Sequence, residues 1–514
     1  MNNLQRIIIL VPFIICQFML NAQHWPVIIG DNISTNNASL IEDYDNGYLL
    51  GNWNYKTPAY TNYGWIVKTD INGDLLWDKT FGDGVYAMGF SDVKRNSDNA
   101  IVIAGSIGKY DNIYHLDPLF LKLNVCGEVE WCTVLHKEGS TGDDYGIRIV
   151  ELPDGGYIGL LKYYGVQYQT IRISLVRMDA YGEPLWIQHL AQGDTTIFNE
   201  EAYDLIVTSG LNYLVAGHCY SSGLKAFFIM TDQQGNEIWD LKWNNQNVQS
   251  GNVNRVIEKN NGIFYASGGG KYGFYTHPVL FKFDGDGNEL FYRLLLGDSL
   301  KGGGAMPLAL LTDTTLAIGY NYGTNSNPNY GNSEIATIDT LGNVIDHRRL
   351  QEENRPPSNI IKTFDGKIVV TGHYVLDGNW DIFLWKMNNR LEDDSLYTRA
   401  FVYDSLCSYP ITSDTIDLSC GIHVDLDEIP TKEAYDHPLI VFPNPAMRSL
   451  NIETRPGLNQ RVEIMSSSGI PFQKVNLPYT GQLTLDISTW PHGLYLVCLF
   501  DEGRYVRSVK ILVN

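Results

Sequence analysis

The sequence predicts an all-β protein built from one repeated four-stranded sheet. Three observations support this prediction: the composition, a turn that recurs along most of the chain, and short apolar segments between those turns. The chain has 514 residues, with 49 glycines and 32 tyrosines, and only 18% of its residues are charged. Helical proteins contain more Ala, Leu, Glu and Lys, so this composition favours strands and turns. The length is ample for more than one folded unit.

The charge balance excludes one class of partner. Lys and Arg number 37 against 58 Asp and Glu, which gives a net charge of −21, and no run of basic residues occurs. Nucleic-acid binding requires a basic surface that neutralises phosphates. Nucleic acid is therefore not an expected partner.

Residues 1–22 have the pattern of a signal peptide. Arg6 is followed by an apolar run, and the segment ends in Asn21-Ala22. The alternative is a membrane anchor, but Pro12 and Gln17 interrupt the run, and it is shorter than the roughly 20 apolar residues that a span requires. We expect an exported chain with no membrane span after cleavage.

A tight turn recurs through the middle of the chain. Its first copy is Asp70–Gly73, followed by Trp77 on the returning segment. The later copies begin at Asn124, Asp179, Asp232, Asp284, Asp339 and, in degenerate form, Asn388. Asp or Asn can bond its own backbone two residues on, and Gly accepts a positive φ, so each copy predicts a β-hairpin turn. The fourth-position glycines of the intact copies recur every 52 to 55 residues, which indicates a structural repeat.

A second recurring strand precedes each of these hairpins. Examples are Tyr48–Gly51 and Ile101–Gly105, and a turn such as Asp45–Gly47 comes before each one. One period therefore holds four short strands and leaves no room for a long helix. Seven such sheets packed around an axis form a seven-bladed β-propeller, here predicted over residues 23–399, with Trp side chains in the seams. A two-sheet sandwich is the alternative, but it does not require this period.

The closure of the ring is also predicted. Trp25 precedes Gly30 by the same five residues that separate Trp77 from Gly82. We therefore expect Trp25–Ile29 to supply the outer strand of the last blade. A loose terminal strand is the alternative.

The sequence pattern changes at Leu439. Alternating apolar residues and turns predict a small immunoglobulin-like β-sandwich over residues 438–514. The motifs in this region are, in order, Pro443-Asn444-Pro445, Leu485-Asp486-Ile487-Ser488, Pro491–Leu496 and Val509–Leu512. In this order they resemble the C-terminal sorting domains of the type IX secretion system of Bacteroidota. The resemblance implies recognition by an outer-membrane translocon and a secreted or surface-attached product. The family commonly has a Lys pair near its end, where this chain has only Lys510. An immunoglobulin-like binding domain is the alternative.

The Asp-rich segment 400–437 is predicted to be a linker. Six cysteines remain after the signal peptide, and six thiols allow 15 pairings. Cys407 and Cys420 are the expected disulfide, because they lie 13 residues apart in a segment with little else to hold its shape. Cys126 and Cys132 are expected to be ordinary buried thiols.

No motif predicts a catalytic residue, a metal site or a cofactor. Residues 268–273 fit G-x-G-x-x-G, but they follow one predicted strand and precede another, so they read as a glycine-rich loop. The acidic residues of 284–289 lack the spacing of a calcium-binding EF-hand loop. The histidines show no H-E-x-x-H, and no serine lies in G-x-S-x-G.

Loop position is more informative than motifs. In a four-stranded meander, the loops that join the second strand to the third and one blade to the next share one end of the propeller. Aromatic candidates on this end are Trp53, Tyr60, Tyr63, Tyr110, Tyr114, Tyr164, Tyr168, Tyr272, Tyr275 and Tyr322, with Tyr330 and Trp380 beside them. Carboxylates on the same end are Asp83, Asp143, Asp144, Asp194, Glu200, Glu201 and Asp298. Rings that stack on sugars and carboxylates that accept from hydroxyls suit a glycan, and they suit a protein equally well. A Tyr-rich acidic protein would also expose such residues without any function.

The predicted function is binding or adhesion outside the cell. The rival is a secreted polysaccharide-degrading enzyme, which requires an axial pocket with two carboxylates, or a carboxylate and a His, on opposite walls. Glu200 and Glu201 are the example considered for such a pair. A third possibility is a structural spacer in a surface layer.

Overall fold

In the computed structural model the described part of the chain consists of strands and turns, without a helix. The described residues are 25–513, except for 31–34, 57–60, 83–86, 110–111, 138–141, 165–170, 191–199, 221–223, 244–248, 261, 273–274, 296–300, 325–326, 351–355, 377–378, 425–438, 455, 457–459, 467–470 and 502–503. The predicted signal peptide lies outside this part.

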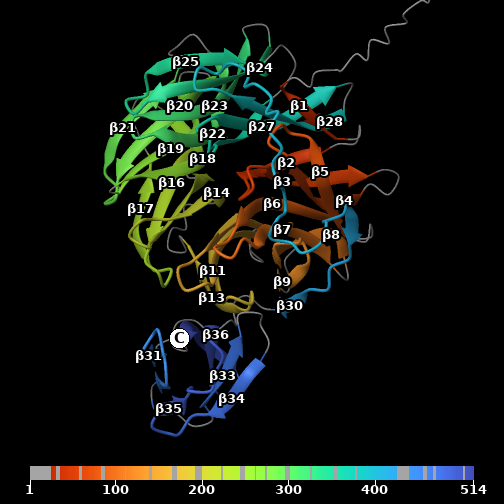
Figure 1. Cartoon of the computed structure of the whole chain (residues 1–514). Coiled ribbons are helices and arrows are strands. Elements are labelled where there is room, and N and C mark those ends of the chain that lie inside the picture. Colours follow the sequence, from red (N-terminus) through yellow and green to blue (C-terminus); the bar gives the residue numbers. More distant parts are fainter. Residues whose placement is uncertain are drawn as a thin grey trace, which may run out of the picture.

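Seven four-stranded antiparallel sheets follow one another around a ring (Figure 1), and we number them as blades 1 to 7. Blade 1 contains β2 (Thr35–Glu42), β3 (Tyr48–Lys56), β4 (Thr61–Thr69) and β5 (Leu75–Phe81). Blade 2 contains β6 (Met88–Arg95), β7 (Ile101–Lys109), β8 (Asn112–Leu123) and β9 (Val129–His136). Blade 3 contains β10 (Tyr145–Glu151), β11 (Tyr157–Tyr164), β12 (Ile171–Met178) and β13 (Pro184–His189).

The remaining blades repeat this order. Blade 4 contains β14 (Glu200–Val207), β15 (Tyr213–Tyr220), β16 (Leu224–Thr231) and β17 (Glu237–Lys242). Blade 5 contains β18 (Gln249–Lys259), β19 (Ile263–Tyr272), β20 (Tyr275–Asp284) and β21 (Glu289–Leu294). Blade 6 contains β22 (Lys301–Thr312), β23 (Thr315–Thr324), β24 (Asn327–Asp339) and β25 (Val344–Arg349). Blade 7 contains β26 (Pro357–Lys362), β27 (Ile368–Leu376), β28 (Asn379–Met387) and β1 (Val27–Ile29).

The ring is closed, which confirms the predicted seven-bladed propeller. The first strands of successive blades contact one another from β2 through β6, β10, β14, β18, β22 and β26, and β26 contacts β2. β1 completes blade 7, as predicted, by pairing antiparallel with β28, with Val27 opposite Leu384 and Ile29 opposite Ile382. The first and last parts of the propeller sequence thus share one sheet. The glycine-rich run at 268–270 lies within β19 and pairs with β18 and β20, so the predicted glycine-rich loop is wrong and these residues form a strand.

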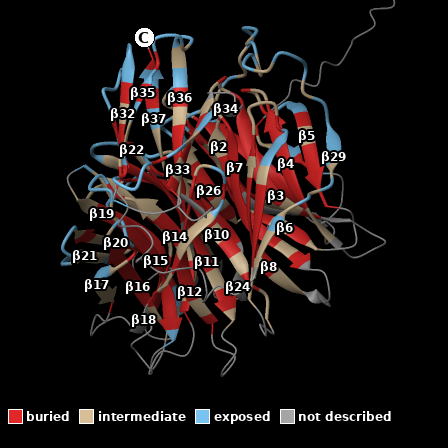
Figure 2. Cartoon of the chain, turned by 90° about the horizontal axis from the view of Figure 1, so that it is seen from below, coloured by how far each residue is buried: buried red, intermediate tan, exposed pale blue. Residues whose placement is uncertain are grey.

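The hydrophobic core lies between the blades. Buried side chains of neighbouring sheets form common clusters, and the buried parts of the strands gather where the sheets face each other (Figure 2). At the predicted hairpin turns, the Asp179 Oδ1 atom accepts from the N–H groups of Tyr181 and Glu183 at 2.8 and 2.9 Å. Gly182 has a φ of +78°, as the turn requires.

The segment that follows blade 7 runs along blades 1 and 2, and we call residues 397–424 the strap. The expected linker is described as far as residue 424, and this part pairs with the propeller. β29 (Asp414–Ile416) pairs parallel with β5, and β30 (Gly421–Val424) pairs parallel with β9. The strap therefore adds a fifth strand to the outer edges of blades 1 and 2.

Two disulfides hold the strap, and they correct the predicted pairing. Cys407 does not pair with Cys420. Instead, Cys126 bonds to Cys407 and Cys132 bonds to Cys420, with Cα atoms 5.3 and 4.6 Å apart. Cys126 and Cys132 are therefore not free thiols; the free ones among the described residues are Cys219 and Cys498. Parallel pairing of the strap with blade 2 brings together cysteines that are more than 280 residues apart in sequence.

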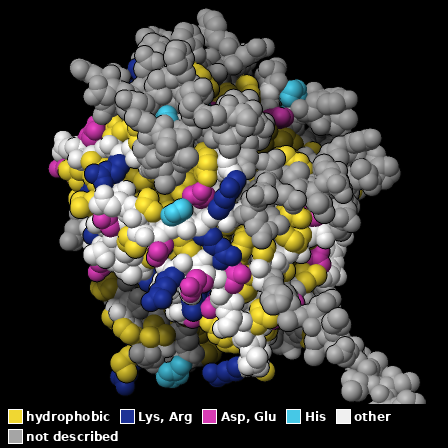
Figure 3. Space-filling model, turned by 90° about the horizontal axis from the view of Figure 1, so that it is seen from above, with side chains coloured by type: hydrophobic (Ala, Val, Ile, Leu, Met, Phe, Trp, Pro, Cys, Tyr) yellow, Lys and Arg dark blue, Asp and Glu magenta, His cyan; other side chains and the backbone are white. Residues whose placement is uncertain are grey.

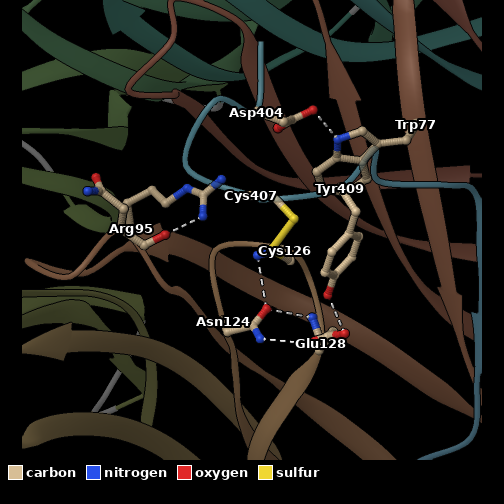
Figure 4. Close-up of a disulfide and its surroundings, with 9 residues drawn as sticks. Trp77, Arg95, Asn124, Cys126, Glu128, Asp404, Cys407 and Tyr409 are labelled. Atoms are coloured by element: carbon tan, nitrogen blue, oxygen red, sulfur yellow. Dashed lines mark hydrogen bonds between the residues drawn. A yellow bond between two sulfur atoms is a disulfide. The ribbon is translucent and has the colours of Figure 1, made fainter. Parts of the chain in front are cut away.

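Polar contacts fix the strap around the first disulfide (Figure 4). The Trp77 indole N–H donates to Asp404 Oδ2 at 2.8 Å, and the Tyr409 hydroxyl donates to Glu128 Oε1 at 2.5 Å. Further inside, the buried Lys68 ammonium contacts the carboxylates of Asp43 and Asp45. Because Asp45 also accepts from the backbone N–H of Asp404 at 2.9 Å, the strap joins a buried ionic network of blade 1.

The C-terminal domain is a two-sheet sandwich. One sheet contains β31 (Ile440–Phe442), β32 (Ser449–Glu453) and β35 (Gln482–Asp486). The other contains β34 (Pro471–Asn476), β33 (Gln460–Ser466), β36 (Gly493–Asp501) and β37 (Arg504–Val513). The two sheets enclose their own apolar core, as the alternating pattern predicts. A contact to the propeller comes from blade 3, where the Tyr181 hydroxyl lies 3.1 Å from Met465 Sδ.

Candidate binding site

A β-bulge recurs in the first strand of each blade. Its partner register shifts at the same point in all seven sheets. The residues that follow the bulge are therefore equivalent: Ser39, Asp92, Arg148, Asp204, Arg255, Leu308 and Asn359. Since the first strands contact one another around the axis, this position places four charged residues of blades 2 to 5 near the centre of the ring.

Two arginines share one carboxylate at this position. Arg148 Nε donates to Asp204 Oδ1 at 2.9 Å, and an Nη atom of Arg255 donates to the same oxygen at 3.2 Å. The other oxygen of Asp204 accepts from the backbone N–H of Val256 at 2.8 Å. The three side chains are almost fully buried, so the group is a rigid and weakly solvated charge cluster.

Asp92 has a different set of neighbours. Its Oδ1 atom accepts from the Ser39 hydroxyl at 3.3 Å, and its Oδ2 atom accepts from the backbone N–H of Ile149 at 3.3 Å. The Lys94 ammonium lies 3.4 Å away. Asp92 therefore contacts groups of blades 1, 2 and 3, and its charge also acts on Arg148 and Arg255.

The pKa shifts follow this arrangement. Burial acts against the charge of Asp204, but Arg255 and Arg148 outweigh it and lower the pKa of the carboxyl. Burial also acts against Arg148, yet Asp92 and Asp204 raise the pKa of its guanidinium. For Arg255, burial and repulsion by Arg148 lower the pKa. Arg255 is thus the less compensated of the two cations, although an arginine remains protonated at neutral pH.

A cavity of about 410 Å³ lies above this cluster. Its described lining residues come from blades 1, 2, 3, 4, 5 and 7 and from the residue before β6. Its described lining residues are Trp53, Asn62, Ala87, Met88, Gly89, Phe90, Ser91, Ser106, Leu116, Tyr145, Ile147, Arg148, Tyr203, Asn254, Arg255 and Ser358. Many of them lie at the beginning of a first strand or next to the loop between the second and third strands, so the cavity belongs to the end where the sequence places its binding loops. A volume of this size accommodates a small ligand.

The wall combines aromatic rings with hydrogen-bonding groups. Trp53, Tyr145 and Tyr203 supply rings, and Asn62, Asn254 and several serines supply amides and hydroxyls. Tyr203 is held in place by its hydroxyl, which donates to Glu201 Oε2 at 2.7 Å. Burial and this carboxylate raise the pKa of Tyr203, so the phenol is neutral over the physiological range.

The structure brings few of the predicted aromatic residues together. Trp53 lines the cavity, whereas Tyr63, Tyr164 and Tyr322 do not belong to its described lining. Tyr322 instead donates to Glu334, and Tyr164 donates its backbone N–H to Asp144. Tyr60, Tyr110 and Tyr168 lie outside the described residues, as do the side chains of Tyr114, Tyr272, Tyr275 and Tyr330. Trp380 is 43% exposed and packs against His373.

The predicted carboxylates do not form an acid–base pair at the cavity. Glu200 and Glu201 are neighbours on β14 but contact different residues. Glu201 accepts from the Tyr203 hydroxyl, whereas the Glu200 Oε2 atom lies 3.9 Å from an Nη atom of Arg172. Adjacent residues of a strand point to opposite faces, which explains the separation. Asp143 and Asp144 lie at the start of blade 3 and bond backbone groups of Leu116 and Tyr164. Asp83, Asp194 and Asp298 lie outside the described part.

Sequence reasoning missed the residues at the centre of the cavity. Tyr145, Arg148, Tyr203 and Arg255 lie on first strands, whereas the predicted binding residues were assigned to loops. A signal was available: blades 2 to 5 each have a charged residue directly before a Val, Ile or Leu at the same strand position, namely Asp92, Arg148, Asp204 and Arg255. Charges at equivalent positions of a repeat indicate a common location, and for the first strands of a propeller that location is near the axis.

The described residues on one face of the molecule are mixed in charge. On the face seen from above in Figure 3, acidic and basic side chains alternate among hydrophobic ones and form no field of one sign. Within the described ranges no group of three or more His, Cys, Asp and Glu residues converges as a metal site. No helix that could cross a membrane occurs among the residues that the structure describes.

Comparison with solved structures gives distant likenesses. A protein of unknown function from Bacteroides caccae is 14% identical, with a TM-score of 0.31, and the match covers 50% of this chain and 81% of that one. A protein of unknown function from Dyadobacter fermentans is 12% identical, with a TM-score of 0.38 and coverage of 57% and 92%. Drosophila Semaphorin 1a, extracellular domains 1-2, is 9% identical, with a TM-score of 0.42 and coverage of 70% and 88%. Structural similarities this weak do not support a conclusion about the chain. The fold is therefore assigned from the sheet topology. No curated protein matches the chain.

The C-terminal domain has a clear relative. Residues 440–514 match the family described as the secretion system C-terminal sorting domain. The match covers the two-sheet sandwich and confirms the resemblance seen in its motifs. This chain therefore carries a type IX secretion sorting domain behind a seven-bladed propeller, and the protein is secreted or attached to the cell surface.

Proposed function

We propose that the propeller is a glycan-binding module that acts outside the cell or at its surface, with the axial cavity as its binding site. Export is a property of the sorting domain, whereas binding would be the task of the propeller. A rigid ring with a cavity at its loop-bearing end is a common arrangement for recognition.

One observation carries this proposal: the cavity combines aromatic rings with neutral hydrogen-bonding groups from several blades. Trp53 and Tyr203 offer flat apolar faces, and Asn62 and Ser106 offer donors and acceptors. Sugars have apolar ring faces and many hydroxyls, so they match this combination. Because the groups come from different blades, closure of the ring would preorganise them before any ligand arrives.

Binding can be tested with the mature chain, residues 23–514, on a glycan array. The protein should include the strap, since ending it at residue 399 would remove the partners of Cys126 and Cys132. Trp53→Ala and Tyr203→Ala should each weaken an observed hit by about tenfold or more, because each removes a stacking surface worth roughly 1–3 kcal/mol.

Trp380→Ala is the matched control. Trp380 is an exposed aromatic residue on blade 7 and is not among the described lining residues, so its loss should leave the same hit unchanged. An array without hits, or hits that survive both cavity substitutions, would contradict the proposal.

A further inference from the structure

Two arginines and two carboxylates meet at the propeller axis. Asp204 accepts hydrogen bonds from Arg148 and Arg255, and Asp92 also stabilises the charge of both. The Lys94 side chain beside Asp92 is 40% exposed, so it is not one of the buried charges. A buried cation is stabilised by each nearby negative charge, so an anion in the cavity would add to what the two carboxylates supply.

The positive side of this charge cluster is accessible from the cavity. Arg148 and Arg255 are the charged side chains among its described lining residues, and neither Asp92 nor Asp204 is among them. A ligand in the cavity would therefore meet guanidinium groups and no carboxylate from the described wall. This arrangement lies inside a protein whose net charge is −21, so it is not a consequence of a generally basic surface.

Some N–H donors of the two guanidinium groups are not used in their described hydrogen bonds. Each guanidinium has five N–H bonds, and Arg255 uses one Nη atom in its described hydrogen bond to Asp204. Arg148 uses Nε for Asp204, and one Nη atom lies at 3.3 Å from the carbonyl oxygens of Ser91 and Ile147. Both groups converge on a single oxygen of Asp204, so their remaining donors lie close together. Planar guanidinium groups in this arrangement suit a carboxylate, which accepts two parallel hydrogen bonds.

We propose that the ligand of the axial cavity is an acidic sugar whose carboxylate binds to Arg148 and Arg255. This inference rests on the proposed glycan-binding function and specifies its ligand class. The rings of Trp53 and Tyr203 contact the face of the sugar, and the Asn62 amide hydrogen-bonds to its hydroxyl groups. The two arginines bind its carboxylate. A uronic acid has all three features, and the cavity volume is adequate for a unit of this size.

Isothermal titration calorimetry of the mature chain provides the test. The probes are D-galacturonate and D-galactose, which differ at one carbon by a carboxylate in place of a hydroxymethyl group. Galacturonate should bind at least tenfold more tightly than galactose, because a charge-assisted hydrogen bond is worth about 1.5–3 kcal/mol. Arg255→Gln should remove this preference, and Arg255→Lys should restore only part of it, since Lys lacks the planar fork.

Arg390→Gln is the control variant. It removes the same charge from the exposed turn of blade 7, on the opposite end of the propeller, and should leave the preference intact. Thermal unfolding of each variant shows whether it is folded; Arg255→Lys keeps a cation beside Asp204 and serves as the second test if Arg255→Gln does not fold.

The results separate this inference from the proposed function. Equal binding of both sugars, unaffected by Arg255→Gln, would overturn the carboxylate site and leave glycan binding standing. Absence of binding for both sugars would also overturn the acidic-sugar inference, while the array with its Trp53 and Tyr203 variants decides glycan binding independently. A preference for galacturonate that depends on Arg255 and not on Arg390 would support it.

Discussion

The indole ring of Trp131 lies against Gly182 of the next blade, and its N–H donates to the carbonyl oxygen of Ala180 at 3.2 Å. The same relation recurs around the ring: Trp186 lies on Gly235, Trp239 on Gly287, and Trp25 of the closing strand on Gly73. Trp131, Trp186, Trp239 and Trp25 therefore pack under the hairpin turn of the following blade, whereas Trp77 donates to Asp404 and Lys79 lies nearest to Gly127. This contact explains the fixed spacing of Gly and Trp in the blades that have both.

Replacement of Gly182 by Ala should test this contact. Gly182 has a φ of +78°, and a Cβ atom there would overlap the Trp131 ring. We expect a loss of about 2–4 kcal/mol in the free energy of unfolding, from backbone strain and from overpacking. Gly366→Ala is the control, because Gly366 has a similar φ of +75° and no atom within 4 Å of the added Cβ. Urea unfolding should show a clearly smaller loss for the control, and equal losses would refute the role of the Trp contact.

The strap disulfides should be visible in peptide mapping and in stability. Digestion without reductant should yield peptides that join Cys126 to Cys407 and Cys132 to Cys420; a Cys407–Cys420 peptide would disprove the pairing. Reduction should lower the free energy of unfolding by about 2–4 kcal/mol per bond, because each bond closes a long loop. The double variant Cys126→Ser/Cys407→Ser should lose part of this sensitivity to reductant. Cys219→Ala, which removes a free thiol, should retain all of it.

Glu42 should make stability depend on pH. Burial is the main cause that raises the pKa of Glu42 to about 7, despite a hydrogen bond from the backbone N–H of Phe364. An ordinary Glu titrates near 4.5, so the folded state holds this proton more tightly than the unfolded state does. Stability should therefore fall as the pH rises from about 4.5 to about 7.

Glu42→Gln should abolish this fall and stabilise the protein more at pH 8 than at pH 5. Thermal unfolding at the two pH values measures the difference. Glu258→Gln neutralises a carboxylate with a similar contact, hydrogen bonds from Ser209 of the preceding blade, and reports the cost of the substitution itself. A Glu42→Gln variant with the same stability change at both pH values would show that Glu42 does not control the effect.

Closure by β1 should contribute to the stability of the whole ring. Trp25 is 6% exposed and contacts Gly73 of blade 1, so Trp25→Ala should cost about 3 kcal/mol. Trp380→Ala, at a residue that is 43% exposed, should cost about 1 kcal/mol or less. Chemical denaturation compares the two; similar losses would mean that the closing strand is dispensable.

The hairpin turns and strand order could be predicted because they depend on neighbours in sequence. The Asp179 side chain caps N–H groups two and four residues away, and Gly182 supplies the positive φ, so both signals lie within one turn. Repetition of this turn determined the number of blades, and the spacing after Trp25 located the closing strand. The sorting domain was recognisable for the same reason, since its motifs are local and ordered.

The strap and the axial cavity depended on contacts between distant segments. Cys407 appeared closest to Cys420 along the chain, but parallel pairing of the strap with blade 2 brought Cys420 to Cys132. Arg148 and Arg255 lie on separate blades, and only ring closure and a shared bulge position direct both to Asp204. Short-range hydrogen bonding is encoded in a few consecutive residues, whereas the position of a charge or a thiol in space depends on how all the sheets pack.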